Sequence, residues 1–382
     1  MPRYPGFSPP ISAMPTSVYS ALAHRLSTMS GETYPLHVGD TWMEPPEGCR
    51  MEDFPVSAYP GIHRYAPVQG LNPLLDAIAE RTTARTGFPT QRSEVLVAAG
   101  ATGGLGAVIG GLLAPGDEVV ILAPYWPLIA GMVISFHGRP VPVSILGLDT
   151  VEGLISSVEA AITPKTAALY VNTPNNPTGR VLPRAWIEAM AELARKHDLW
   201  LISDEVYEDY VYVGDHTYAR PFAPERTFSA YSFSKAFGMA GNRCGYVVGP
   251  AKGMEQLRKV STHTFYSTPT ASQWAAIRAL EGPGDRWVAM ARGQYLETGK
   301  RASEILGVPC PEGSTFLFFD VVKSLDDSGM GGLLEKCVEQ GILVAPGNSF
   351  GPFPTHIRLC FTCSPPEVVL RGVEKLARIL AH

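Results

Sequence analysis

The sequence predicts an α/β fold of three layers, in which helices cover both faces of a mostly parallel sheet and a smaller α/β unit follows at the C-terminal end. Between residues 94 and 249, short β-branched runs alternate with helical stretches, as in consecutive β-α-β units. A second, shorter alternation begins near residue 315. The chain has 382 residues, 45% of them hydrophobic, so it is long enough for two cores.

Seven apolar runs are the expected strands of the large sheet: 94–99, 118–123, 139–145, 167–172, 199–205, 227–232 and 245–248. The clearest helix between them is 183–197, which begins with a proline. It carries Trp186, Ile187, Met190 and Leu193 on one face, so it should pack on the sheet.

Helical character continues over 251–263, 268–280 and 285–306. The smaller unit should contain strands 315–321, 342–345 and 356–361, with helices 333–340 and 366–381. We therefore expect a large domain over 46–284 and a small C-terminal domain over 285–382. Residues 1–45 are rich in proline and should form an arm or join the small domain.

Charge and composition exclude several classes of protein. The net charge of -5 and the lack of a run of basic residues argue against binding to nucleic acid. The first ten residues lack the pattern of a secretory signal, and no stretch approaches the roughly 20 apolar residues of a membrane span. We expect a cytoplasmic protein that binds no membrane.

The six cysteines are scattered, which is not the density of a disulfide scaffold. Cys360 and Cys363 form the only Cys-x-x-Cys pair, and no second pair exists to complete a zinc site. We expect ordinary reduced cysteines and no metal, with a redox or metal site as the alternative.

Unusual polar segments follow four of the expected strands. Gly100-Ala-Thr-Gly-Gly104 follows the first, Asn172-Thr-Pro-Asn-Asn-Pro-Thr-Gly179 the fourth, Asp204-Glu205 ends the fifth, and Lys235 follows the sixth. Ligands of open α/β sheets bind beyond the carboxyl ends of the strands. We therefore expect all four segments at one edge of the sheet, around one site.

Each segment has a chemical and a structural interpretation. A buried Asp204 needs a cationic partner such as a pyridinium, although it could instead cap a turn. The turn at Gly100 opens a helix that suits a phosphate; its glycines do not form Gly-x-Gly-x-x-Gly, and helix packing is the alternative. Lys235 lies after a strand, with hydroxyls before it and Arg243 after it, as suits a Schiff-base amine beside an anion site.

Motifs in this order resemble a known family. They are Asn175-Asn-Pro-Thr-Gly179, Asp204-Glu-Val-Tyr207, Ser232-Phe-Ser-Lys-Ala-Phe-Gly238 with Arg243, and Pro346-Gly-Asn-Ser-Phe-Gly351 leading to Ile357-Arg-Leu359. From about Gly39 to the C-terminus, the chain is similar to the class I/II aminotransferases, which are pyridoxal 5'-phosphate (PLP) enzymes of fold type I. The resemblance implies transfer of an amino group between an L-amino acid and a 2-oxo acid through pyridoxamine phosphate.

The resemblance also implies roles for individual residues. Lys235 would form the Schiff base and move the proton between the substrate α-carbon and the cofactor, and Asp204 would bind the pyridine nitrogen. Tyr207 and Asn176 would contact the ring oxygen. The phosphate would be held by Ala101, Thr102, Ser232 and Arg243.

Other implied contacts lie further from the lysine. Trp126, or its neighbour Tyr125, would stack on the cofactor ring. Tyr65 would reach the phosphate of a neighbouring subunit, which implies a homodimer with shared active sites. Gly39, Asn176 and Arg358 would receive the substrate α-carboxylate.

The segment after Gly39, Asp40-Thr-Trp-Met-Glu-Pro-Pro46, departs from the family pattern, so the resemblance does not identify the substrate. His63, Arg64 and His263 are candidates for recognising the substrate side chain, with solvated or core roles as alternatives. The same cofactor site could also serve elimination, cyclisation or decarboxylation. A non-catalytic PLP-binding regulator is the alternative from another class, but only about 38 residues precede Gly39 here.

Overall fold

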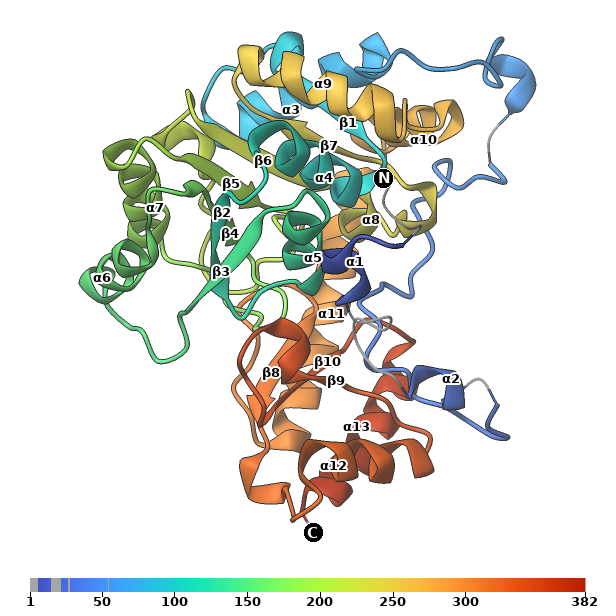
Figure 1. Cartoon of the computed structure of the whole chain (residues 1–382). Coiled ribbons are helices and arrows are strands. Elements are labelled where there is room, and N and C mark those ends of the chain that lie inside the picture. Colours follow the sequence, from blue (N-terminus) through green and yellow to red (C-terminus); the bar gives the residue numbers. More distant parts are fainter. Residues whose placement is uncertain (1–5, 15–21, 27, 54, 382) are drawn as a thin grey trace.

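The computed structural model describes residues 6–14, 22–26, 28–53 and 55–381. Its elements form two units, one around a seven-stranded sheet and one around a three-stranded sheet (Figure 1). This confirms the mixed α/β class expected from the sequence. Within these described ranges, no helix is both long enough and apolar enough to cross a membrane.

The strand order of the large sheet brings the polar strand ends together. In spatial order the strands are β1 (Val95–Ala98), β7 (Gly245–Val248), β6 (Thr227–Ser232), β5 (Trp200–Asp204), β4 (Thr166–Asn172), β2 (Glu118–Ala123) and β3 (Arg139–Ser144). β7 runs antiparallel to β1 and β6, and the other pairs of neighbouring strands are parallel. Six strands therefore end at the edge where β7 begins.

Alternating side chains of the central strands form the interfaces between the three layers. Val119 and Ile121 pack in one core with Leu105 and Val133, and Val120 and Leu122 point the other way into a second core. The first layer contains α4 (Gly100–Leu112), α5 (Pro127–Ser135) and α9 (Ala251–Thr264), and the second contains α6 (Val151–Ala161) and α7 (Arg184–Lys196). Both faces of the sheet are covered, as parallel sheets require.

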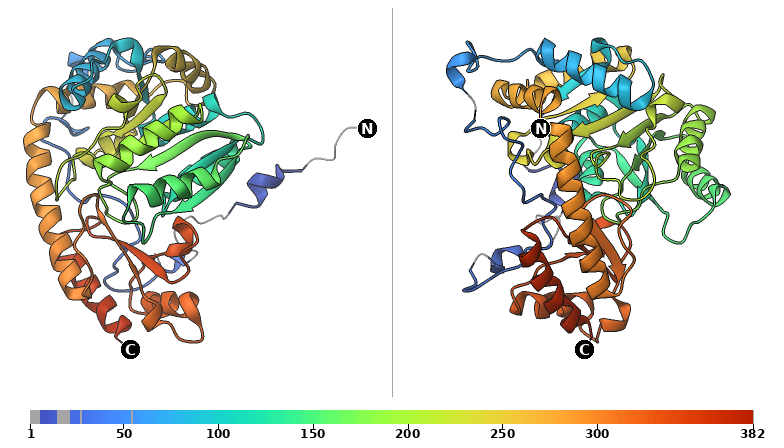
Figure 2. Two further views of the ribbon diagram at one scale, coloured as in Figure 1. Left: turned by 90° about the vertical axis from the view of Figure 1, so that its left-hand side faces the viewer. Right: turned by 180° about the vertical axis from the view of Figure 1, so that it is seen from behind.

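The remaining helices lie around the β1 end of the sheet or in the smaller unit, except for the first of them, which packs beside α5. They are α1 (Pro9–Ser12), α2 (Ala23–Leu26), α3 (Asn72–Thr86), α8 (Phe233–Ala236), α10 (Thr270–Glu281), α11 (Gly284–Leu306), α12 (Gly329–Glu339) and α13 (Pro366–Leu380). Helix α11 runs from the larger unit to the smaller one along one side of the molecule (Figure 2). The small sheet has the antiparallel order β8 (Phe316–Asp320), β10 (His356–Cys360), β9 (Ala345–Pro346).

The strand predicted over 342–345 is largely wrong. Only Ala345–Pro346 pairs with β10, whereas Ile342 forms an isolated parallel bridge with Tyr34. The N–H of Tyr34 donates to the Gly341 carbonyl at 2.7 Å, and the N–H of Leu343 donates to Tyr34 at 3.1 Å. The N-terminal segment around Tyr34 therefore takes the hydrogen bonds that a longer β9 would have used.

Candidate active site

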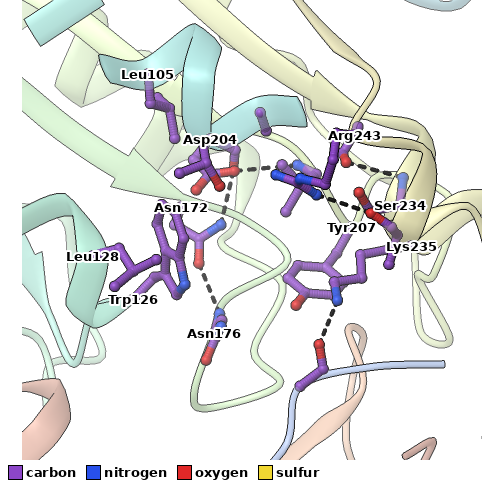
Figure 3. A pocket seen from close by; sticks show the side chains of 16 residues that line it. Leu105, Trp126, Leu128, Asn172, Asn176, Asp204, Tyr207, Ser234, Lys235 and Arg243 are labelled. Atoms are coloured by element: carbon purple, nitrogen blue, oxygen red, sulfur yellow. Dashed lines mark hydrogen bonds between the residues drawn. The ribbon is translucent and has the colours of Figure 1, made fainter. Parts of the chain in front are cut away.

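A cavity of about 210 Å³ lies at the carboxyl edge of the large sheet. Figure 3 shows the residues that line it: Gly39, Ala101, Thr102, Leu105, Trp126, Leu128, Asn172, Asn176, Asp204, Val206, Tyr207, Ser232, Ser234, Lys235, Ala240 and Arg243. Ten of these were singled out from the sequence. The cavity therefore brings together the ends of β4, β5 and β6, the first turn of α4 and the segment before β7.

Lys235 enters the cavity from α8, the short helix that follows β6. Ser232 begins this helix, and its hydroxyl oxygen accepts the N–H of Ser234 at 3.0 Å. The Tyr210 hydroxyl donates to the Lys235 carbonyl at 2.8 Å and so holds the turn. The Lys235 Nζ donates to the Gly39 carbonyl, and burial lowers the pKa of Lys235.

Asp204 is the last residue of β5 and is buried beside the cavity. Its Oδ2 accepts the Tyr170 hydroxyl at 2.7 Å, and its Oδ1 accepts the N–H of Val206 at 3.4 Å, which is a long contact. Burial raises the pKa of Asp204 to about 6, against the opposing effects of these two hydrogen bonds. A carboxylate in this environment would be stabilised by a cationic N–H donor in the cavity.

The loop after β4 is held by amide side chains. Asn172 donates from Nδ2 to the Asp204 carbonyl at 2.9 Å and accepts the N–H of Asn176 at its Oδ1 at 2.7 Å. The Asn175 Oδ1 accepts both the N–H and the hydroxyl of Thr178, at 3.0 and 2.7 Å. Gly179 has a φ of 71°, and a Cβ there would lie 2.8 Å from a backbone oxygen, so the turn requires glycine.

Arg358 comes from β10 of the smaller unit and is completely buried. Its Nη1 donates to the Asn176 Oδ1 at 2.9 Å, and its Nη2 donates to the His37 carbonyl at 2.6 Å. The guanidinium lies between the rings of Phe316 and Phe350, 4.3 and 4.7 Å from their centroids. Arg358 is not among the lining residues, but it reaches the cavity wall through Asn176.

The end of the cavity formed by Arg243 and the first turn of α4 has the features of an anion site. Arg243 has a left-handed φ of 50°, and its Nη2 approaches the Ala99 carbonyl at 3.4 Å. Ala101 and Thr102 lie in the first turn of α4, where helix N–H groups have no partner in the preceding turn. Gly100 has a φ of 71°, and a Cβ there would lie 2.5 Å from the Arg243 Nη2. This close approach of arginine and helix N-terminus suits a phosphate.

Two aromatic side chains complete the lining. Trp126 precedes α5, and Tyr207 is buried with its ring edge against Phe316 at 5.8 Å between centroids. Tyr125, the alternative to Trp126, is not part of the lining.

Four candidates lie away from this cavity. Tyr65 is 86% exposed, with its ring edge against Tyr266 at 5.0 Å, and it borders a surface groove together with His63 and Arg64. His263 is exposed on α9, where its Nδ1 contacts the Lys259 carbonyl at 2.7 Å. None of His63, Arg64 and His263 lines the cavity of its own chain.

The cysteines are free thiols in this structure. Cys360 is buried at the end of β10, and the Cys363 thiol donates to the Cys360 carbonyl at 3.3 Å. Within the part of the chain that the structure describes, no three side chains of the metal-ligating types gather into a cluster.

Sequence reasoning missed part of the lining. Asn172 was recognised only as the beginning of a loop, and Leu105, Leu128, Val206, Ser234 and Ala240 were not singled out. Parallel pairing aligns Asn172 with Asp204, which explains why the Asn172 side chain reaches the backbone there. The register of β4 and β5 is the signal that would have identified it.

Comparison with known proteins identifies the family. The family model for class I and II aminotransferases matches residues 43–376. An aspartate/prephenate aminotransferase of Thermus thermophilus is 36% identical over 330 residues, which cover 84% of each protein. An arginine–pyruvate transaminase of Pseudomonas aeruginosa is 36% identical over 314 residues, covering 78% of each.

Solved structures of aminotransferases have the same fold. The aspartate aminotransferase of Thermus thermophilus with maleate gives a TM-score of 0.89 at 32% identity, covering 98% of this chain and 100% of that chain. An aromatic aminotransferase of Pyrococcus horikoshii gives 0.83 at 28% identity, covering 94% and 99%. The chain therefore belongs to the class I and II aminotransferase family, and it is an enzyme of the PLP-dependent transaminase type with fold type I.

Proposed function

We propose that this aminotransferase carries PLP on Lys235 and moves an amino group between an L-amino acid and a 2-oxo acid. One observation carries the proposal: the Lys235 amine, the buried Asp204 carboxylate and the first turn of α4 all border one cavity. These groups suit, in that order, a covalent link to an aldehyde, a pyridine nitrogen and a phosphate.

The residues around the cavity fit this cofactor. Burial without a cationic partner raises the pKa of Asp204 to about 6, and a protonated ring nitrogen would be such a partner. Arg243, Ser232 and the N–H groups of Ala101 and Thr102 are the proposed phosphate ligands. Tyr207 and Asn176 would contact the ring oxygen, and Trp126 would cover the face of the ring.

When bound, PLP supplies an electron sink that makes the α-proton of an amino acid acidic. Lys235 has two tasks in this reaction. Burial lowers the pKa of Lys235, which increases the fraction of the neutral, nucleophilic amine. Nζ would also take the proton from the substrate α-carbon and hold it for return during the transfer.

Arg358 and Gly39 are the proposed carboxylate site. The aromatic rings on both sides and the bond to Asn176 hold the guanidinium in one orientation, which favours bidentate binding of a carboxylate. A Cβ at Gly39 would lie 4.0 Å from the Arg358 Nη2, so the Gly39 backbone is close enough to share the same ligand. Every α-amino acid has this carboxylate, so the contact selects the class of substrate and not its side chain.

We also propose a homodimer with shared active sites. Tyr65 is a large aromatic residue exposed beside Tyr266 and outside the cavity of its own chain. Exposed tyrosines of this kind are typical of interfaces, where the ring packs and the hydroxyl hydrogen-bonds. In the proposal, the Tyr65 hydroxyl donates to the phosphate in the partner's cavity.

A half-reaction tests the proposed function. The PLP-loaded enzyme is mixed with an amino acid in the absence of an oxo acid, and the products of one turnover are measured. One equivalent of 2-oxo acid per active site is expected, with the amino group retained on the enzyme. Release of ammonia instead would favour an elimination reaction and contradict the proposal.

Variants assign the reaction to Lys235. Lys235→Ala should slow the half-reaction by about 10²–10⁴-fold, because the proton transfer loses its base. Lys252→Ala is the matched control, because Lys252 is exposed on α9 and should leave the rate unchanged.

A further inference from the structure

The segment from Leu36 to Trp42 is bound along the end of β10. The N–H of Cys360 donates to the Leu36 carbonyl at 2.7 Å, and the N–H of Trp42 donates to the Thr362 carbonyl at 2.9 Å. Gly39 lies in the middle of this segment. A tight turn forms there, in which the N–H of Asp40 donates to the Val38 carbonyl at 3.1 Å.

One side chain fixes the far side of this turn. Thr362 is fully buried, and its hydroxyl donates to the Asp40 carbonyl at 2.7 Å. The Cys360 thiol approaches the same oxygen at 3.5 Å, which is the longer and weaker contact because a thiol is a poor donor. The Thr362 hydroxyl is therefore the main side-chain donor that holds the peptide after Asp40.

The turn connects Thr362 with the reacting amine. The Gly39 carbonyl accepts a hydrogen bond from the Lys235 Nζ, one residue before the carbonyl that Thr362 binds. On its other side Gly39 is confined by Phe316, because a Cβ there would lie 3.0 Å from the ring. Thr362 therefore restrains the peptide group directly after the one whose carbonyl meets the amine.

We propose that Thr362 is a positioning residue that holds the Gly39 turn against the Lys235 amine and against the carboxylate site beside Arg358. Thr362 does not line the cavity, so in this proposal it acts through the backbone of the Gly39 turn. The inference rests on the proposed roles of Lys235 and Gly39.

The Gly39 carbonyl is one of several groups that act on the lysine. Burial lowers the pKa of Lys235, negative charge on Asp40 and Cys360 acts to raise it, and the guanidinium groups of Arg358 and Arg243 act to lower it. The carbonyl accepts a proton from the amine and so favours the ammonium form. Loss of this contact should therefore make Lys235 deprotonate at a lower pH.

Thr362→Val tests the proposal, because valine has nearly the same shape and lacks the hydroxyl. Two quantities are measured: the pH dependence of Lys235 acylation in the full-length, cofactor-free chain, followed by mass spectrometry, and KM and kcat of the PLP-loaded enzyme. The acylation midpoint should move to lower pH by about half a unit, and KM for the amino acid should rise about fivefold to tenfold. Thr362→Ser should restore both values.

Thr227→Val is the matched control. Thr227 is equally buried, and its hydroxyl donates at 2.7 Å to the Ala223 carbonyl at the opposite end of β6 from Lys235. This variant should lose similar stability and leave the acylation midpoint and KM unchanged. An unchanged midpoint and KM in Thr362→Val, or equal changes in Thr227→Val, would overturn the role of Thr362. The proposed function would survive that result, since it depends on the half-reaction and on Lys235→Ala.

Discussion

At the scale of the residue, Asp204 carries the clearest electrostatic signature of the site. Its side chain is buried, and the Tyr170 hydroxyl is its one short hydrogen bond among the described contacts. Burial raises the pKa from 3.8 to about 6, which corresponds to a cost of about 3 kcal/mol for keeping the carboxylate charged. In the proposed function, a positively charged ligand beside Asp204 would offset this cost.

The stability of the cofactor-free protein should therefore depend on pH through Asp204. Because the folded state binds this proton more tightly than the unfolded state, the free energy of unfolding falls as pH rises from about 4 to 6. Asp204→Asn should remove this part of the pH dependence, which amounts to about 3 kcal/mol. Urea unfolding at pH 4 and pH 7 measures it. If the free energy of unfolding changed equally between these pH values in the wild-type protein and in Asp204→Asn, Asp204 would not be responsible.

The residues of the site differ in how far the sequence could predict them. Lys235, Asp204 and the Asn172–Gly179 loop follow strand ends, so the rule for open α/β sheets was enough to gather them. The hydrogen bond from Tyr170 to Asp204 joins neighbouring parallel strands and could not be foreseen without their register. The role of Thr362 depends on contact with a segment more than 300 residues earlier in the chain, which no local pattern reveals.

At the scale of the element, the first turn of α4 lines the end of the cavity that we propose binds phosphate. Its first residue, Gly100, has a positive φ and lies against Arg243, whereas Gly106 in the same helix has open space around its Cα. Glycine is required at position 100 by the positive φ and by the close approach of the Arg243 guanidinium. At position 106 nothing requires glycine, which there only lowers the stability of the helix.

Gly100→Ala should therefore weaken PLP binding and destabilise the fold by about 1–3 kcal/mol. Gly106→Ala is the matched control in the same helix and should stabilise the protein by about 0.5–1 kcal/mol without changing PLP affinity. Cofactor titration and thermal unfolding give both values. Unchanged PLP affinity in Gly100→Ala would argue against a phosphate site at this helix end.

Elements with strong local patterns were predicted well. The expected strands 118–123, 227–232 and 245–248 have the bounds of β2, β6 and β7. The strand at 342–345 was misplaced because its partner, Tyr34, comes from a remote segment without a strand pattern. Helix α12 begins at Gly329, before the predicted position, because its first turn contains glycines that weaken the sequence signal.

At the scale of the whole molecule, the open question of assembly centres on Tyr65. This residue lies outside the cavity of its own chain, so its proposed contact with the cofactor requires a second copy. Sequence patterning alone could not predict this contact, because nothing in local periodicity encodes an interface.

Mixing a Lys235→Ala variant with a Tyr65→Ala variant, which should bind PLP more weakly, tests shared sites. In a hybrid of one Lys235→Ala chain and one Tyr65→Ala chain, one cavity has both defects and the other has a native lysine together with a native tyrosine from its partner. In each hybrid, one of the two cavities should therefore bind PLP with wild-type affinity and have wild-type activity. If Tyr65 acted within its own chain, or not at all, no recovery of PLP affinity over the Tyr65→Ala homodimer would occur.

The identity of the cofactor-bearing lysine is the central claim, and chemical trapping tests it most directly. The PLP-loaded protein is reduced with borohydride and digested, and the modified peptide is sequenced by mass spectrometry. The account predicts a single label on Lys235. A label on the exposed Lys165 or Lys252 with Lys235 unmodified would contradict it.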